Sequence, residues 1–172
     1  LVMTPDGKKV YVTGTESDKI IELVLVTPFD ITTAYWTGVS LSISSQTGDP
    51  RSLILNSDGS KLYLKGSITT QLFEYSMSTA YDLSTVVYSS TIIIPSIDYM
   101  SMSHDGKYIY GGYGNYLKQF KTDGTAHVPV TITPSGTTWA FDKTSIIDDY
   151  KTLSINSSIQ NSNISVDGTK MF

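Results

Sequence analysis

One short pattern recurs four times along the 172-residue chain. It is an Asp-Gly pair that is followed by an apolar and then an aromatic residue, and its aspartates are Asp6, Asp58, Asp105 and Asp167. Asp-Gly supplies the positive φ that a tight turn needs, and apolar residues alternate on both sides, so each copy predicts a β-hairpin. The strand after each turn is apolar or aromatic on both faces, which is typical of a strand inside a stack of sheets.

A second segment repeats with the same stride. Residues 22–33 align without a gap on residues 74–85, and this offset of 52 residues equals the distance from Asp6 to Asp58. Repeats of about 40 to 50 residues that contain only strands and turns indicate the four-stranded blades of a propeller. The sequence therefore predicts an all-β fold, a β-propeller fragment of about three four-stranded antiparallel blades that is part of a larger ring of about seven blades.

The repeats also set the expected domain organisation. We expect one propeller segment over residues 1–172, with repeats at about 1–51, 52–98 and 99–161 and the start of a further repeat at 162–172. In the first repeat we expect strands at 1–4, 8–14, 19–26 and 37–44. The third repeat departs from the pattern, because two prolines and two glycines within 123–138 predict an irregular insertion. Three blades do not close a ring of about four to eight, so we expect further blades in a longer parent chain.

Composition argues against several classes of partner. Charged residues make up 16% of the chain, against about 25% in an average soluble domain, and the net charge is −4 without any Lys/Arg run. This pattern lacks the basic surface of a nucleic-acid binder, so we expect no nucleic-acid partner. The absence of cysteine excludes disulfides and thiolate metal sites. The apolar runs are far shorter than the roughly 18 residues that span a bilayer, so no membrane insertion is expected.

The sequence contains few groups that could carry chemistry. His104 and His127 are the only histidines, and the first occupies a turn position while the second lies in the insertion. The chain has no nucleophile elbow, phosphate-binding loop, metalloprotease helix or calcium-loop spacing. We therefore expect no catalytic residue, no metal and no cofactor in this segment.

The recurring acidic residues favour a structural interpretation. Asp30 and Asp82 recur at one turn, and the Asp-Gly aspartates recur at another, whereas a catalytic group is normally needed once per active site. Hydrogen bonds from the following backbone amides explain such aspartates, although paired carboxylates can also bind calcium or act as acid and base. Glu22 and Glu74 recur between apolar neighbours, and we expect them to be solvated or structurally paired.

Strand order predicts where a binding face would lie. In a propeller the Asp-Gly turns and the turns at Asp30 and Asp82 share one face, while the variable connections share the other. Loops that vary on a fixed scaffold often carry recognition. The candidate binding residues on this variable face are Glu16, Asp18, Lys19, Asp49, Arg51, Asp98, Tyr99, Tyr113, Asn115 and Asn161. The alternative, that these residues only form solvated loops, stays open at this point.

The repeat resembles a known group of propeller repeats. Residues 58–63, 74–85 and 167–172 are similar to repeats found in structural proteins of bacteriophages and in some bacterial surface proteins. The resemblance covers the chain except for the insertion at 123–138, and it implies a virion or surface location without any catalytic residue. Lactonase-like and quinoprotein-like propellers also carry Pro-Asp-Gly hairpins, so the repeat is specific for architecture only.

Two functional classes follow from these observations. The first is a non-enzymatic structural or adhesion module of a virion (phage capsid, tail or tail fibre) or of a cell surface. Its partners would be other protein subunits of a larger assembly, and a host receptor or glycan is a further option. The alternative is a propeller hydrolase or lactonase-like enzyme whose active site is completed by blades that are not present here. The resemblance and the low charge favour the first class.

Overall fold

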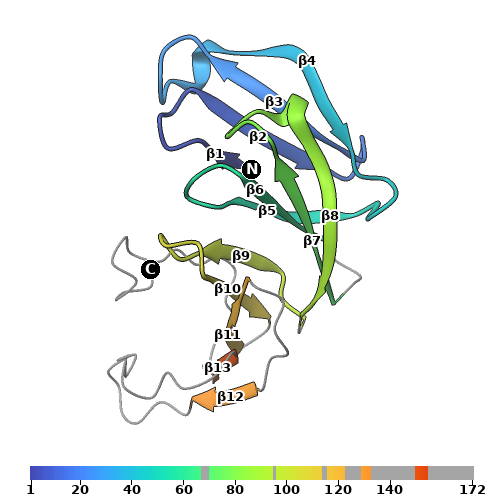
Figure 1. The fold of residues 1–172 in the computed structure, drawn as a ribbon, viewed down its shortest axis with the longest axis vertical. Coiled ribbons are helices and arrows are strands. Elements are labelled where there is room, and N and C mark those ends of the chain that lie inside the picture. The colour runs from blue at the N-terminus through green and yellow to red at the C-terminus, as the bar shows by residue number, and fades with distance from the viewer. Residues whose placement is uncertain (67–69, 95, 114–115, 123–128, 133–149, 155–172) are drawn as a thin grey trace. The chain divides into compact units, whose positions relative to one another are not determined.

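The computed structural model describes residues 1–66, 70–94, 96–113, 116–122, 129–132 and 150–154 (Figure 1). The chain divides into two compact units, Leu1–Ile93 and Ile94–Phe172. Regular structure within the described residues consists of β-strands and two single 3₁₀ turns. The fourth Asp-Gly copy, His127 and the expected start of a further repeat at 162–172 lie outside the described residues.

The first sheet contains four consecutive antiparallel strands. They are β1 (Val2–Met3), β2 (Lys9–Gly14), β3 (Lys19–Leu25) and β4 (Ala34–Ser42), and the 3₁₀ turn η1 (Ile31–Thr33) joins the last two. β4 begins earlier than the expected 37–44, because Ala34 already pairs with Leu25. A bulge opposite Glu22, where Gly38 has a φ of 93°, then lets the strand continue.

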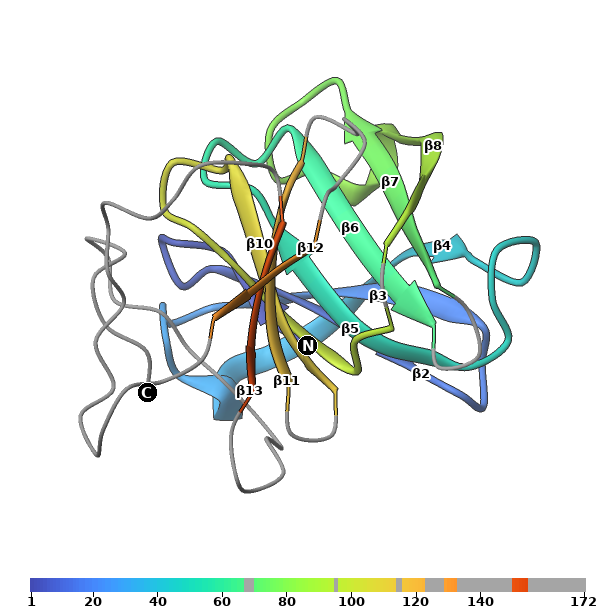
Figure 2. The same cartoon turned by 90° about the horizontal axis from the view of Figure 1, so that it is seen from below.

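The second sheet repeats the first along the chain. Its strands are β5 (Pro50–Leu55), β6 (Lys61–Gly66), β7 (Gln71–Met77) and β8 (Val86–Ile93), with the 3₁₀ turn η2 (Leu83–Thr85) before β8. β2, β3 and η1 each recur 52 residues later as β6, β7 and η2, as the sequence offset predicts. Figure 2 shows these four strands side by side in one twisted sheet.

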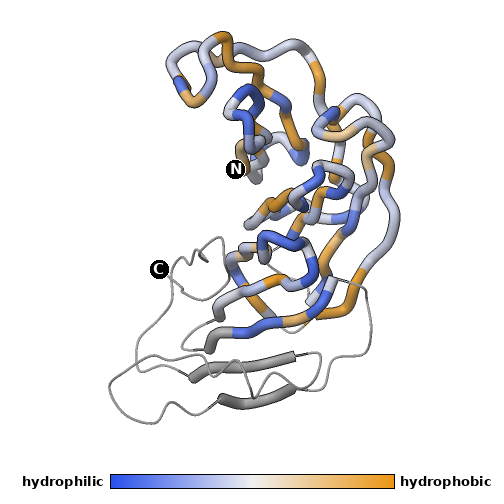
Figure 3. The backbone as a smooth tube through the Cα atoms, turned by 60° about the vertical axis from the view of Figure 1, so that its left-hand side comes forward, coloured by the Kyte–Doolittle hydropathy of each residue, from blue (hydrophilic) through white to orange (hydrophobic). Residues whose placement is uncertain are grey.

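A hydrophobic core joins the first two sheets. Tyr11, Ile20 and Ile43 from the first repeat pack with a larger apolar set from the second. That set is Leu53, Leu62, Leu64, Phe73, Tyr75, Met77 and Leu83. Apolar and polar stretches alternate along the chain (Figure 3), which is the pattern expected when each strand contributes side chains to the core and the turns lie in water.

The second unit contains a sheet of five strands. Its order is β12 (Pro129–Ile132), β13 (Tyr150–Ser154), β11 (Tyr116–Lys121), β10 (Tyr108–Tyr113) and β9 (Tyr99–Met102). Of the expected insertion at 123–138 the structure describes Pro129–Ile132, which forms an edge strand parallel to β13, and its other residues lie outside the described ranges. A proline is compatible with that place, since it begins an edge strand and need not donate a ladder hydrogen bond.

Candidate functional site

The two ends of the first two sheets differ in how their turns are built. We call the ends that carry residues 4–8, 27–33, 56–60 and 79–85 the structural rim, and the ends that carry residues 15–18 and 43–49 the variable rim. Successive antiparallel strands place the Asp-Gly turns and the two 3₁₀ turns at the same end. The backbone hydrogen bond from Phe29 N to Gly7 O (2.9 Å) joins these two kinds of turn in the first sheet.

The aspartates of the Asp-Gly turns hold their own loops. Asp6 Oδ1 accepts hydrogen bonds from the Thr4 hydroxyl (2.6 Å) and from the backbone N–H of Lys8 (3.1 Å). Asp105 repeats this arrangement with the Ser103 hydroxyl and Lys107 N, whereas Asp58 accepts both the hydroxyl and the backbone N–H of Ser60. In all three turns the hydroxyl hydrogen bond is the main cause of a lowered carboxyl pKa. The structural interpretation of these aspartates is therefore confirmed.

The two 3₁₀ turns are capped in the same way. Asp30 Oδ1 accepts from Thr32 N, and Asp82 Oδ1 accepts from Ser84 N, both at 3.0 Å. Each aspartate also accepts the hydroxyl of the same partner at 2.6 Å, and this bond lowers the pKa of Asp82. These carboxylates are used as caps, so the structural rim offers little free chemistry.

An aromatic ring closes each of the first two Asp-Gly turns. Phe29 and Tyr81 both have a positive φ, 64° and 56°, which is uncommon for aromatic residues. Their rings lie so close to Gly7 and Gly59 that a methyl group on either glycine would fall 2.5–2.6 Å from ring carbons. Glycine is therefore required there both for its φ of about +70° and for the space it leaves.

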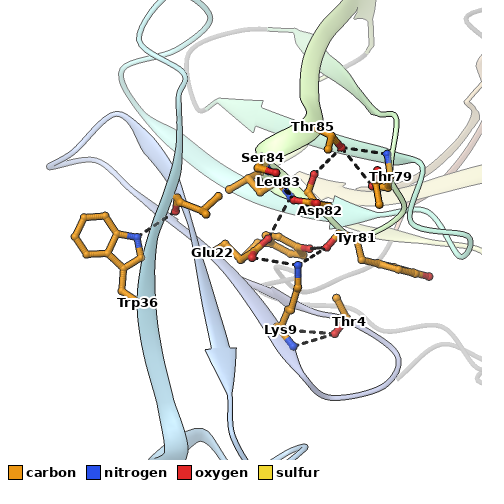
Figure 4. A network of polar contacts seen from close by, with 12 residues as sticks. Thr4, Lys9, Glu22, Trp36, Thr79, Tyr81, Asp82, Leu83, Ser84 and Thr85 are labelled. Atoms are coloured by element: carbon orange, nitrogen blue, oxygen red, sulfur yellow. Dashed lines mark hydrogen bonds and ion pairs between the residues drawn. The ribbon is translucent and has the colours of Figure 1, made fainter.

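A polar cluster links the first sheet to the turn of the second (Figure 4). The Tyr81 carbonyl accepts hydrogen bonds from the Tyr11 hydroxyl (2.7 Å) and from Lys9 Nζ (2.9 Å). Glu22 Oε1 pairs with the same Lys9 Nζ at 3.1 Å, and Glu22 Oε2 accepts the backbone N–H of Leu83 at 3.2 Å. We call Lys9, Tyr11 and Glu22 the docking triad, because they fasten one repeat onto the next.

Burial makes the docking triad sensitive to change. Glu22 is only 4% exposed and Tyr11 is fully buried, and burial together with the nearby Glu22 charge raises the pKa of the Tyr11 hydroxyl. The expectation that Glu22 and Glu74 are structurally paired is confirmed, since Glu74 Oε1 lies 3.0 Å from Lys61 Nζ. Sequence reasoning missed that Glu22 links one repeat to the next. The signal was that Lys9 and Glu22 both recur 52 residues later, as Lys61 and Glu74.

The variable rim contains a carboxylate with unmet hydrogen-bonding capacity. Asp18 ends the β2–β3 turn with a φ of 47°, and its carbonyl accepts the backbone N–H of Ile43 at 2.8 Å. Asp18 Oδ1 is buried and has no hydrogen-bond partner among the described residues. Native proteins rarely leave a buried carboxylate oxygen in this state, and strained, unsatisfied groups are often found at functional sites.

The loop before β5 lies beside Asp18. A methyl group at Gly48 would be 3.8 Å from Asp18 Oδ1, so the backbone of this loop passes close to the carboxylate. Asp49 N donates to Thr47 Oγ1 at 3.1 Å, and Asp49 Oδ2 pairs with the Arg51 guanidinium at 3.1 Å. The variable rim thus carries the Asp18 and Asp49 carboxylates and the exposed Arg51 guanidinium near the start of β5.

The structure places the predicted face residues in three groups. Glu16 and Lys19 are exposed beside half-buried Asp18 in the β2–β3 turn, and Asp49 and Arg51 come from the β4–β5 connection. In the second unit, Asp98 N donates to Gly112 O at 2.7 Å and Tyr99 begins β9 as an exposed residue. Tyr113 ends β10, and Asn115 and Asn161 lie outside the described residues. Within the first unit, the structure brings the Gly48–Asp49 loop beside Asp18 and pairs Asp49 with Arg51.

Sequence reasoning missed two features of this rim. Thr47 lies so close to Gly66 that a methyl group on Gly66 would be 2.4 Å from Thr47 Oγ1. The order Thr-Gly-Asp-Pro at 47–50 could have indicated a tight turn at this place. Lys65, at the same end of β6, is buried and its Nζ donates to the Gly66 carbonyl. A lysine between apolar strand residues gave no sign of such burial.

The arrangement is suited to carboxylate chemistry. A half-buried aspartate can accept a proton from water or orient a bound molecule. Within the described ranges, no three or more His, Asp or Glu side chains come close enough together to hold a metal ion. In the same ranges, no helix has both the length and the apolar character needed to cross a membrane.

Comparisons with known proteins concern the fold. No protein-family model matches the chain, and no curated protein matches it either. A proposed 6-phosphogluconolactonase from Bacteroides uniformis matches 99% of this chain with a TM-score of 0.61 and 20% identity. A similar protein from Bacteroides fragilis matches the same share with a TM-score of 0.60 and 20% identity. Hydrazine synthase from Kuenenia stuttgartiensis matches 98% with a TM-score of 0.62 and 15% identity.

These similarities confirm the predicted fold class, an all-β propeller fragment. The chain spans 45% of the length of each of the two Bacteroides proteins. They also correct the functional expectation. The expected structural or adhesion module of a virion or cell surface was wrong, because two of the structures matched across nearly the whole chain are proposed lactonases, which favours the alternative of a lactonase-like propeller. The resemblance does not separate the two functional classes, because the Asp-Gly turns on which it rests are common to many propellers.

Proposed function

We propose that this chain is part of a β-propeller lactone hydrolase whose active site is completed by further blades. The observation that carries the proposal is the match of 99% of the chain to two proposed 6-phosphogluconolactonases with TM-scores of 0.61 and 0.60. The site geometry supports the same choice, because the variable rim holds a buried carboxylate oxygen with no described partner. The Asp carboxylates of the structural rim are already used as caps.

Asp18 is the residue that we assign to the reaction. In lactone hydrolysis a water oxygen attacks the carbonyl carbon, and the ring C–O bond breaks to give a carboxylic acid and an alcohol. The Asp18 carboxylate takes a proton from the attacking water, and that proton is then passed to the leaving ring oxygen. Burial of Oδ1 holds the carboxylate in one orientation, which favours a single position for the water.

The substrate class that suits this rim is an anionic sugar lactone. The chain carries a net charge of −4, so an anionic substrate needs local cations to approach it. Arg51 and Lys19 are exposed on the same rim as Asp18, and a guanidinium binds phosphate or carboxylate oxygens in a bidentate way. We assign them to substrate binding and Asp18 to proton transfer.

The test is an activity measurement on the full-length protein. Release of acid from D-glucono-δ-lactone and from its 6-phosphate is followed with a pH indicator and corrected for spontaneous hydrolysis. We expect enzyme-dependent hydrolysis, with kcat/KM at least about 100-fold lower for Asp18→Asn, since general base catalysis contributes about 10²–10⁴. Ser17→Ala, an exposed change in the same turn at a residue outside the proposed site, is the control and should keep full activity.

Arg51→Ala should raise KM for the phosphorylated lactone more than for the neutral one. A folded full-length protein that hydrolyses neither lactone above the spontaneous rate would overturn the proposal. Equal kcat/KM for wild type and Asp18→Asn would overturn the assignment of Asp18, while leaving the enzyme class in place.

A further inference from the structure

The outward face of the first sheet repeats, residue for residue, a face that is covered in the second sheet. In the second sheet, Leu53, Leu64, Phe73, Tyr75 and Leu83 pack against the first sheet. The residues 52 positions earlier are Leu1, Val12, Ile21, Leu23 and Ile31, and all of them are apolar. The first sheet therefore presents the same kind of apolar face as the one that the docking triad covers.

The two faces differ in exposure and not in local structure. Leu83 is 2% exposed, whereas Ile31, at the same place in an equivalent 3₁₀ turn, is 59% exposed. Along the strands, Val12, Ile21 and Leu23 are half-buried, whereas their counterparts Leu64, Phe73 and Tyr75 are buried. The hydrogen bonds within the turns agree to about 0.1 Å; for example, Thr27 N to Thr33 Oγ1 is 3.0 Å, and the equivalent bond in the second repeat is 3.1 Å. The difference in exposure arises because the docking triad of the first sheet covers the turn at Leu83.

We propose that the uncovered face of the first sheet binds a further blade of the same repeat, one that carries its own docking triad. By the geometry of the covered interface, the tyrosine hydroxyl and the lysine ammonium of that blade donate to the Phe29 carbonyl. Its glutamate accepts the backbone N–H of Ile31. The apolar face around Leu23 then packs as the face around Tyr75 does. This interface does not depend on the proposed lactone hydrolysis.

The three side chains of the docking triad show which partner fits the exposed face of the first sheet. A second copy of this chain would offer its third sheet, but that sheet has Tyr108 in place of Lys9 and Gln119 in place of Glu22. It keeps only the tyrosine, Tyr110, and so lacks both the ammonium and the carboxylate. In the second sheet the equivalent Glu74 is buried and is not accessible to another molecule. A further blade of the parent protein is the occupant that fits.

Photo-crosslinking in the full-length protein tests this interface. Ile31→p-benzoylphenylalanine places the crosslinker on the proposed contact. Val26→p-benzoylphenylalanine is the matched control, because Val26 is 73% exposed and its counterpart in the covered repeat is the polar Ser78. We expect the first variant to crosslink within one polypeptide, to a strand that carries the Lys-x-Tyr pattern, and the control to give at most one-tenth of that yield.

A crosslinked dimer, a crosslink to another segment, or equal yields from the two positions would overturn the proposal. Stability gives a second readout. In the full-length protein, Ile31→Asp should lower the midpoint of thermal unfolding by roughly 5 °C, while Val26→Asp should change it by less than about 1 °C. Equal small shifts for both variants would show that Ile31 stays in water and would also overturn the proposal.

Discussion

Replacing Glu22 by glutamine tests whether one repeat is fastened to the next by a charged side chain. The Glu22 carboxylate accepts from Lys9 Nζ with one oxygen (3.1 Å) and from Leu83 N with the other (3.2 Å). Glutamine has a single acceptor oxygen, so Glu22→Gln leaves one of these two donors facing an NH₂ group. The change keeps the size of the side chain, so the effect reports on polar contacts and not on a cavity.

The magnitude follows from burial. A hydrogen bond to a charged group contributes about 1.5–3 kcal/mol, and a buried donor left without an acceptor costs about 1–3 kcal/mol. The Lys9 side chain is 28% exposed, so water can replace part of its contact, and we place the loss near 2 kcal/mol. At about 2–4 °C per kcal/mol for a domain of this size, the midpoint of thermal unfolding falls by roughly 4–8 °C.

The measurement is urea unfolding of wild type, Glu22→Gln, Lys9→Met and the double variant. Two residues in contact should show a coupling free energy of at least about 0.5 kcal/mol. Glu16→Gln, on an exposed turn, is the control and should lie within about 0.5 kcal/mol of wild type. A Glu22→Gln variant as stable as this control, with no coupling to Lys9, would refute the proposed role of the docking triad.

Two further predictions concern a glycine and the turn carboxylates. Gly66→Ala should cost roughly 1–3 kcal/mol, because the new methyl group would lie 2.4 Å from Thr47 Oγ1; Gly14→Ala, at the same place one repeat earlier, has nothing within 4 Å and should leave the urea midpoint unchanged. Hydrogen bonds hold the pKa of Asp58 below its ordinary value, so its contribution to stability is present above about pH 4 and is lost as pH falls through the lower folded-state value. Asp58→Asn should therefore reduce the fall in urea midpoint between pH 5 and pH 3, and an unchanged fall would contradict this assignment.

The repeated parts of the fold were predictable because local chemistry decides them. The Asp-Gly turns predicted β2 and β3 to within one residue at each end, and the constant offset of 52 residues carries both strands over to β6 and β7. The early start of β4 was not predicted, because it depends on the pairing of Ala34 with Leu25, and the bulge at Gly38 that lets the strand continue is likewise visible only in the pairing. The edge strand at Pro129–Ile132 was missed for a similar reason, since its proline and short length favour a loop when the pairing with β13 is unknown.

The site was only partly predictable. Sequence position identified the variable rim and included Asp18 and Asp49, but it could not show that Asp18 Oδ1 is buried or that Gly48 passes beside it. Those facts depend on how the β2–β3 turn meets the β4–β5 loop, which is a tertiary property. The functional class was wrong for a related reason, because Pro-Asp-Gly hairpins stabilise propellers of many functions and carry no information about the chemistry on the opposite rim.

The central claim is a division of labour, in which one rim holds the repeats together and the other carries the reaction. The most direct test measures both stability and lactone hydrolysis for Asp82→Ala and Asp18→Asn in the full-length protein. Loss of the Asp82 cap should cost about 0.5–2 kcal/mol of stability and leave kcat/KM unchanged. Asp18→Asn should keep or raise stability, since asparagine tolerates the positive φ and removes the negative charge from a side chain whose buried Oδ1 has no hydrogen-bond partner among the described residues, while kcat/KM falls about 100-fold or more. Activity lost equally in both variants, or lost only in Asp82→Ala, would contradict the account.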